Sequence, residues 1–486
     1  MAGLAGKLPP MPLETARSAL RWALLALLVL SPLPFGAVTP WAVLTIELAA
    51  AVLGAGAVAI LARDPEGLPR RARWILYSAL GVVGIGILQL IPLPHAWTRL
   101  VAAPTAAARE EVERLLPELA TTLAPQSLEP PATADALMRF VAYVLIGLAA
   151  AVAIRTPEHL KHAAMAIAAS GAFQGIYGAG EYLTGHQEIL GHAKKYGLDE
   201  ATGTFVNRNH FAAYLAMSLP FALGLVIESW ERFPRTRSWR ERFLGAWEPE
   251  GRRLLCGGFA AAAIWAGVIL SYSRSGLVVA ILATGLMALA LSRKRRAVWL
   301  LLAVLAAPTL LLLWQQVRAP GERFVSGSES LPTLNDRLPT WLASAKMIPD
   351  YWILGTGLGT FEPAFDLYRP AEIRGRWDHA HNDWLEGSVE GGVAMLAILA
   401  AAGAALVAAL RRRGEATFSR PLPLSAIVSL LAAMAAAFAD FPLRLPAIAF
   451  LLSVVLAATS ALAHGSAREP SSAAVQDFAR PAPRAR

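Results

Sequence analysis

The sequence predicts an all-α polytopic membrane protein with about twelve transmembrane helices and a long, partly helical loop between the ninth and the tenth. The first reason is composition: 56% of the 486 residues are hydrophobic, only 16% are charged, and the mean hydropathy is +0.47. The second is that apolar runs of about 17 to 25 residues, long enough to cross a bilayer, recur along the chain. The third is that lysine and arginine gather in the short segments between these runs.

The first apolar run follows Lys7, Arg17 and Arg21 and resembles a signal peptide. Because further runs follow at once, we interpret it as a membrane span. The expected membrane domain covers residues 1–464, and the Pro-, Ala- and Ser-rich tail 465–486 is expected to be a disordered cytoplasmic end. The expected spans are 20–38, 41–62, 74–93, 137–154, 162–183, 209–227, 254–272, 276–291, 297–314, 385–410, 422–440 and 446–463.

Basic residues follow the even-numbered spans, so the positive-inside rule predicts that both termini are cytoplasmic. The segments 94–137, 184–208 and 315–384 then lie outside. Although the formal charge is +9, its distribution over short loops argues against nucleic-acid binding. Cys256 is the only cysteine, and its apolar surroundings predict a packing residue. The basic segments are Arg63 with Arg70, Arg71 and Arg73, then Arg155 with Lys161, 228–253, 293–296 and 411–413.

Polar side chains gather at the outer ends of the predicted spans, which indicates a polar cavity open to that side. Arg274, in the tight turn SYSRSG, is the most informative of them. An arginine at a span end often snorkels, but a lone cation in so short an outer turn favours an anionic ligand or a structural partner such as Glu47. The others are Asn207, Arg208, Asn209, His210, Gln89, Arg139, Glu181, Asp440 and Arg444.

The segment NDRLPTWLASAKMI in the last outer loop predicts a helix that Asn335 or Asp336 caps and that Arg337 opens. The next segment, ILGTGLGTF, superficially resembles a phosphate-binding loop. No βαβ unit surrounds it, so we expect a turn. The apolar residues at helical spacing are Trp341, Leu342, Ala345 and Ile348.

The segment DHAHNDWLEGSVEGG, residues 378–392, places histidines and carboxylates directly against an apolar run. Burying such groups in hydrocarbon costs several kcal/mol each unless they are paired or face water. His379 and His381 invite a zinc site, but the spacing indicates no third strong ligand, and no D-x-D pair occurs in the chain. A neutral imidazole suits a general base acting on a hydroxyl, and the alternative is a histidine satisfied by hydrogen bonds within the loop.

Taken together, NRNHFAAYLAMSLP, SYSRSG, DRLPTWLASAKMIPDYWILGTGLGTF and HAHNDWLEGSVEGG resemble the O-antigen ligase and O-antigen polymerase superfamily of bacterial inner membranes. The motifs cover about residues 200–395. The resemblance implies a metal-independent, cofactor-free glycosyltransferase. It would take a glycan from undecaprenyl diphosphate at the periplasmic face and pass it to lipid A core or another saccharide.

The resemblance also implies roles for individual residues. Arg208 and Arg274 would bind the diphosphate, and His381 would be the base that lets the acceptor attack with inversion. Either histidine of HAHND fits the position of the base, and the following Asn382 favours His381 over His379. The side chains expected to contact substrate are Arg337, Asn207, Asn209, Asn382, His379 and Arg444.

Other functions are also compatible with these sequence features. A polymerase of the same family, or a relative that glycosylates proteins, would share these motifs. A transporter of lipid-linked glycans is more distant, because transporters place binding groups near the midplane, often within repeated halves, whereas here the polar groups crowd one face. A scaffold protein would not need clustered arginine and histidine.

Overall fold

The computed structural model describes residues 11–195, 197–232, 245, 247–291, 334–373, 375–411 and 420–461. Within them a helix lies at every predicted span, and the span predicted at 297–314 lies outside the described residues, as does the tail 465–486. The helices at these positions are α1 Leu13–Leu30, α2 Pro40–Leu61, α3 Arg70–Leu90, α6 Pro130–Ala153, α7 Pro157–Thr184, α8 Arg208–Arg232, α10 Pro249–Leu270, α11 Arg274–Ala290, α16 Asp383–Arg411, α18 Pro421–Ala436 and α19 Pro446–Ala461.

Six of these helices, α2, α3, α6, α8, α10 and α16, are long and apolar enough to cross a membrane. The apolar helices α11, α18 and α19 are shorter. The prediction of an all-α membrane protein is confirmed within the described residues, and the count of twelve spans stays a prediction.

Helix α8 runs through the centre of the bundle, and 94% of its most apolar window is buried. It packs against α7, α10, α11 and α18. Small residues allow α7 and α10 to approach closely, because a Cβ on Gly175 would lie 2.2 Å from the carbonyl oxygen of Ala263. The helix that begins with the NRNH segment is therefore held rigidly on several sides.

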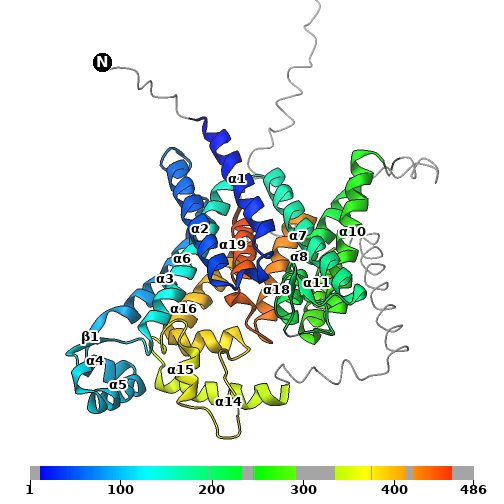
Figure 1. The fold of residues 1–486 in the computed structure, drawn as a ribbon. Helices are drawn as coiled ribbons and strands as arrows, with labels where there is room; N and C mark the ends of the chain where they lie inside the picture. The colour runs from blue at the N-terminus through cyan, green and yellow to red at the C-terminus, as the bar shows by residue number, and fades with distance from the viewer. Residues whose placement is uncertain are drawn as a thin grey trace, which may run out of the picture.

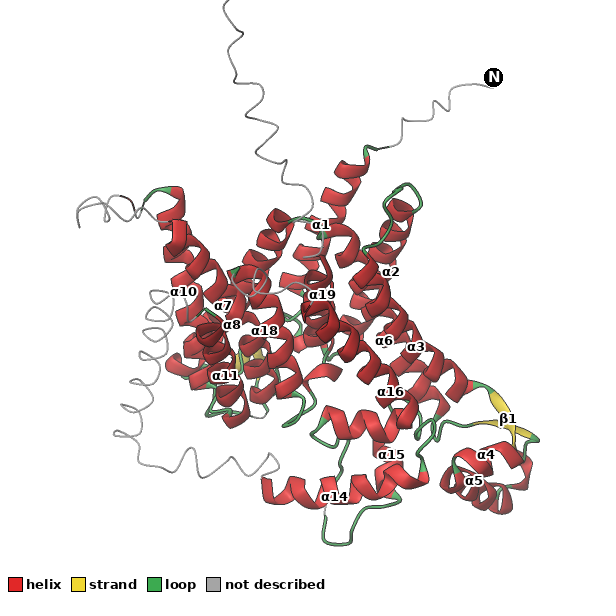
Figure 2. Cartoon of the chain, turned by 180° about the vertical axis from the view of Figure 1, so that it is seen from behind, coloured by secondary structure: helices red, strands yellow, loops and turns green. Residues whose placement is uncertain are grey.

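Shorter elements cover one end of the bundle, opposite the end at which α1 begins (Figure 1; Figure 2 from behind). We call this end the α14 side. The ILGTGLGTF segment forms turns, as predicted. The elements on this side include β1 Pro92–Pro94, α4 His95–Val101, α5 Ala103–Leu115, η2 Pro117–Leu119, β2 Leu123–Pro125, α14 Leu334–Asp350 and α15 Phe361–Asp366.

The strands of the described chain form two short antiparallel pairs, and four further short elements lie between helices of the bundle. Strands β1 and β2 pair antiparallel, with Pro92 opposite Pro125. Strands β3 and β4 form a second antiparallel pair. These remaining elements are η1 Phe35–Ala37, β3 Glu188–Ile189, β4 His192–Ala193 and η3 Pro442–Arg444.

Helix α16 is interrupted at Gly392, where φ is 60° and ψ is −160°. Backbone groups left without a partner by this interruption form hydrogen bonds with residues 352–357. Val393 N donates to Trp352 O at 2.7 Å, and Gly357 N donates to Glu390 O at 3.2 Å. Gln89 of α3 joins the same contact by donating to Glu390 O at 2.8 Å. The break separates a short segment on the α14 side from the long apolar part of the helix, and protein buries the irregular backbone, as the low polarity of a membrane requires.

Charged residues also pair at the opposite end of the bundle. Arg17 and Arg155 approach Asp64 to 2.6 and 2.9 Å, and Arg63 donates to Met11 O at 2.7 Å. The beginning of α1, the α2–α3 loop and the end of α6 therefore meet there, as the predicted alternation of spans requires.

Four details of the sequence analysis are wrong. The first predicted span ends early, at Leu30, because the prolines that follow cannot continue its hydrogen bonds. Helix α14 begins at Leu334, so Asn335 and Asp336 lie inside its first turn and not before it. Its expected apolar face is not the buried one: Leu342 is 59% exposed, whereas Ala343 and Met347 are buried.

The fourth error concerns Cys256, which is exposed and faces away from the bundle. An apolar run reads the same in the sequence whether its side chains pack against protein or face lipid, so composition alone did not place this residue.

Candidate active site

Asp440 is the centre of the candidate site. It lies in the turn between α18 and α19, because α18 ends at Ala436 and not at residue 440 as the sequence suggested. Only 3% of the residue is exposed. A buried carboxylate needs hydrogen-bond donors, and here they come from three distant parts of the chain.

His381 is the first of these donors. Its Nδ1 lies 2.9 Å from Asp440 Oδ1, and the residue is 8% exposed. Its backbone has φ +50°, a left-handed conformation that is uncommon for residues other than glycine and often marks a functional position. Asn382 follows and caps α16, since its Oδ1 accepts hydrogen bonds from the backbone N–H groups of Trp384 and Leu385, both at 3.1 Å. The His-Asn step thus turns the chain into α16 and directs the imidazole toward Asp440.

The beginning of α8 supplies the second part. Asn207 caps this helix by accepting a hydrogen bond from Asn209 N at 2.8 Å. The side chain of Asn209 donates to Asp440 Oδ2 at 2.7 Å, and its own oxygen accepts from Ser273 Oγ at 2.8 Å. His210 Nε2 lies 3.7 Å from Asp440 Oδ1. The NRNH segment therefore builds the site directly.

Helix α14 supplies the third part through Arg337. One guanidinium nitrogen lies 3.5 Å from Asp440 Oδ2, and another donates to the carbonyl oxygen of Ala439. The helix is also tied to the histidine segment, because Trp341 Nε1 donates to Ala380 O at 2.8 Å. Helix α14 is thus part of the site and contacts the His381–Asp440 pair from the α14 side of the bundle.

Arg274 and Arg208 flank this cluster. Arg274 is the first residue of α11, directly after Ser273, which bonds Asn209. Its side chain is exposed and makes no hydrogen bond or ion pair with any described residue, so the structural pairing with Glu47 is absent there. Arg208 pairs with the buried carboxylate of Glu200, while its Nε has no hydrogen-bond partner in the described part of the chain.

A second charged cluster surrounds Glu386. His379 Nδ1 lies 2.8 Å from Glu386 Oε1, and Arg444 Nε lies 2.9 Å from the same oxygen. Arg444 also pairs with Glu390 at 2.8 Å and approaches Asp383 to 3.6 Å. With three carboxylates around it, the Arg444 guanidinium is arranged to hold α16 against the α18–α19 turn, which leaves little of its charge for a substrate.

Phe441 separates the two clusters. Its ring stacks on His379 at 3.9 Å between centroids and meets His381 at 5.1 Å and His210 at 4.6 Å. His379 and His381 therefore bond different carboxylates on either side of one aromatic ring. The two histidines of the H-x-H segment thus do not share one carboxylate partner.

The surroundings of Asp440 favour the ionised form of its carboxyl group. Burial alone would raise the pKa of Asp440, but the neighbouring imidazoles of His210 and His381 hold it well below its ordinary value. An ionised Asp440 accepts a hydrogen bond from Nδ1–H of His381, which leaves Nε2 of that ring as a proton acceptor. The group has the chemistry of a carboxylate-oriented general base.

Seven of the residues that meet here were predicted from the sequence as contacts within the site or as its flanking cations: Arg208, Asn209, Arg274, Arg337, His379, His381 and Arg444. Asp440 was predicted only as one of the outer polar residues, without a role, and neither Ser273 nor Glu390 was singled out. The signal that was available for Asp440 is the turn ADFPLRLP, where a lone carboxylate follows an apolar run. Asn207 and Asn382, expected to bind substrate, use their side-chain oxygens to cap helices.

Residues 259–400 match the family model described as O-antigen ligase. The matched range includes Arg274, Arg337 and His381 and ends within α16. No curated protein matches the chain.

Proposed function

We propose that this chain, whose match over residues 259–400 supports the O-antigen ligase and polymerase superfamily, transfers a glycan from undecaprenyl diphosphate to an acceptor hydroxyl. The observation that carries the proposal is the buried Asp440 carboxylate 2.9 Å from His381 Nδ1, with Arg208 and Arg274 on helix ends next to the same cluster. A metal-free transfer of a sugar from a diphosphate requires a base for the acceptor hydroxyl and cations for the leaving diphosphate.

The proposed reaction is a single displacement. His381 Nε2 removes the proton from the acceptor hydroxyl as its oxygen attacks the anomeric carbon. The bond from that carbon to the diphosphate oxygen breaks, and the diphosphate leaves on the opposite face, so the configuration inverts. Asp440 stabilises the imidazolium that forms, and the fork of an arginine side chain matches the oxygens of the departing diphosphate.

We also propose a location for the active site and an identity for the acceptor. The active site faces the periplasm of the bacterial inner membrane, and the acceptor is lipid A core, as in a ligase. A polymerase would instead extend the lipid-linked glycan itself. The two differ in which acceptor supports turnover, so they are separated by supplying each acceptor to the same enzyme and donor. A transporter would move the lipid-linked glycan without forming a new glycosidic bond.

The experiment uses the protein in nanodiscs with a fluorescent lipid-linked glycan, and it measures donor binding and single-turnover transfer separately. We expect His381→Ala to lower the transfer rate by about 10²- to 10⁴-fold and to leave donor binding nearly unchanged, because a general base acts only in the transition state. Arg274→Ala is expected to weaken both, and Arg274→Lys to restore part, because an ammonium keeps the charge but loses the planar fork.

Arg369→Ala is the matched control, since this arginine lies on the α14 side but outside the cluster. Transfer at the wild-type rate by His381→Ala across pH 6 to 8 would remove His381 as the base. Loss of activity in EDTA, restored by one divalent ion, would overturn the metal-free mechanism.

A further inference from the structure

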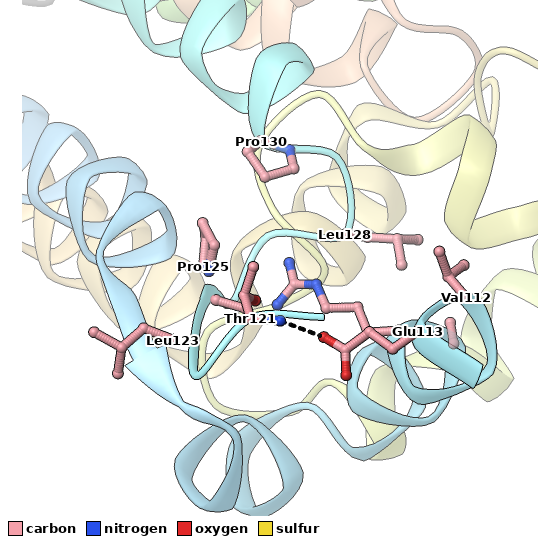
Figure 3. Close-up of a pocket in the computed structure, with 10 residues that line it drawn as sticks. Val112, Glu113, Thr121, Leu123, Pro125, Leu128 and Pro130 are labelled. Atoms are coloured by element: carbon pink, nitrogen blue, oxygen red, sulfur yellow. Dashed lines mark hydrogen bonds between the residues drawn. The ribbon is translucent and has the colours of Figure 1, made fainter. Parts of the chain in front are cut away.

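A groove opens in the small subdomain of residues 92–129, which contains α4 and α5 and lies outside the family match (Figure 3). Its volume is about 410 Å³, within the range of small-ligand sites. Helix α5 forms one wall, and the strand β2 with the start of α6 forms the other. The lining is mostly apolar and includes Val112, Leu123, Pro125, Leu128 and Pro130.

One cation and one anion share this apolar lining. Arg109 donates through Nη2 to Ser127 O at 2.7 Å, while its Nη1 is buried and has no hydrogen-bond partner among the described residues. Glu113, one helical turn further on α5, accepts a hydrogen bond from Thr121 N at 3.4 Å and lies 3.9 Å from His95 Nε2. No ion pair within 4.0 Å joins Arg109 to Glu113 in the described structure. The groove therefore presents two opposite charges that do not neutralise each other directly.

The groove lies where two membrane spans leave the bilayer. Helix α3 ends at Leu90, only one residue before β1, and Pro130 in the lining is the first residue of α6. Both helices are long and apolar enough to cross a membrane. Ser127 N donates to Gln89 O at 3.0 Å, so the subdomain is tied to the end of α3. It has no linker with which to move away from the membrane surface.

Exposed apolar side chains continue from the spans onto this subdomain. Ile91, at the end of α3, is 41% exposed, and Trp97 and Leu100 of α4 are 57% and 71% exposed. Tryptophan at this level is typical of the interface between hydrocarbon and lipid headgroups. The groove thus opens at the depth at which phospholipid headgroups lie.

We infer that this groove binds the phosphoethanolamine headgroup of a membrane phospholipid, with its phosphate on Arg109 and its ammonium on Glu113. The apolar walls would contact the glycerol and the first part of the acyl chains. Charge complementarity selects this headgroup. A phosphate ester without an amine would place its negative charge beside the Glu113 carboxylate with no cation of its own to offset it, and a choline headgroup has no N–H with which to bond Glu113.

Native mass spectrometry of the delipidated full chain with phosphatidylethanolamine, phosphatidylcholine and phosphatidylglycerol of identical acyl chains tests the inference. We expect the wild type to retain phosphatidylethanolamine at least about tenfold more strongly than the other two, since only its ammonium can donate a charge-assisted hydrogen bond to Glu113. Arg109→Gln should lower retention of every phospholipid, and Glu113→Gln should abolish the preference for phosphatidylethanolamine over phosphatidylcholine.

Arg99→Gln and Glu110→Gln are the matched controls, because these residues of α4 and α5 form an ion pair away from the lining, with side chains 63% and 43% exposed. Wild-type preference in both groove variants would overturn the inference, as would stronger retention of phosphatidylglycerol than of phosphatidylethanolamine. If Arg109→Gln fails to fold, Arg109→Lys, which keeps the charge, and Glu113→Gln decide. Competition by free phosphate alone, with no lipid preference, would reduce the groove to an anion site and would also overturn it.

Discussion

At the scale of single residues, Asp440 organises the site because its two carboxylate oxygens are shared among side chains from α8, α14 and the segment before α16. Asn209 and Arg337 approach Oδ2, while His381 bonds Oδ1. The buried carboxylate thus fixes the ring orientation and the tautomer of His381, and the surrounding donors keep it ionised. A positioning residue of this kind contributes to rate without touching the substrate.

Asp440→Asn tests this role. The amide NH₂ of asparagine can donate to Nδ1 of His381, which would favour the tautomer with its proton on Nε2, and that nitrogen then cannot accept a proton from the acceptor. We expect single-turnover transfer to fall by about 10²- to 10⁴-fold with donor binding retained. Glu362→Gln, which alters a half-buried carboxylate paired with the exposed Arg376, is the control and should leave transfer unchanged. Wild-type transfer by Asp440→Asn would rule out the positioning role.

His379 provides a prediction about pH and stability. Burial alone would lower the pKa of His379, but the Glu386 carboxylate raises it above its ordinary value of about 6.5. A pKa raised in the folded state contributes stability that is complete below pH of about 6.5 and is lost as pH rises through the folded-state pKa. His379→Gln should therefore remove part of the fall in Tm that the wild type shows between pH 6 and pH 9.

Thermal unfolding in detergent at the two pH values measures this difference. The control is His186→Gln, which changes an exposed histidine and should show the wild-type dependence. An identical fall in Tm for His379→Gln and for the wild type would show that the His379–Glu386 pair does not couple folding to pH.

At the scale of elements, the interruption of α16 joins the outer loop to the membrane part of the chain. The positive φ of Gly392 permits the break, and a Cβ there would lie 2.6 Å from the carbonyl oxygen of Ile353. On the other side of this contact, a Cβ on Gly355 would lie 2.2 Å from Glu390 O. Two backbones meet here with no room for side chains, so both glycines are fixed by close approach.

Gly392→Ala should therefore destabilise the protein by about 1–3 kcal/mol, the usual cost of a strained backbone conformation. Gly403→Ala is the matched control in the same helix, where an added Cβ meets nothing within 4 Å. Because alanine has the higher helix propensity, we expect this control to be neutral or to stabilise by up to about 1 kcal/mol. Denaturant titration in detergent measures both, and equal stability of the two variants would contradict the close contact.

The sequence was sufficient to locate elements that long apolar runs define, because a run of that length has few other ways to satisfy its backbone. It was weaker where tertiary contacts decide. The buried face of α14 contains Thr340 and Ser344. Because both residues are polar, the hydrophobic periodicity of the sequence assigns them to the solvent-exposed face. The sequence indicated no role for Asp440, because its partners Asn209, Arg337 and His381 are distant in sequence.

At the scale of the whole molecule, the positive-inside pattern and the positions of α1 and α14 at opposite ends make a topology prediction (Figure 1). A single cysteine at Glu372, near the site, should react with an impermeant thiol reagent added from the periplasm. A cysteine at Glu66, in the α2–α3 loop, should not. The background must carry Cys256→Ser, because the native cysteine is exposed.

Reaction of both positions after permeabilisation is the control for accessibility. Labelling at 66 with protection at 372 in intact cells would reverse the orientation and place the site in the cytoplasm, where the proposed acceptor would have to be sought again.

The position of Asp440 between the last two described helices also sets the order in which the site is assembled. The ribosome makes Asn209, Arg274, Arg337 and His381 first, and the turn that holds their common carboxylate follows only with α18 and α19. A nascent chain with α16 already in the bilayer holds an imidazole without its orienting carboxylate. If the chain has the proposed function, the base would stay inactive until α18 and α19 are in place, and truncated products would not consume the lipid-linked donor.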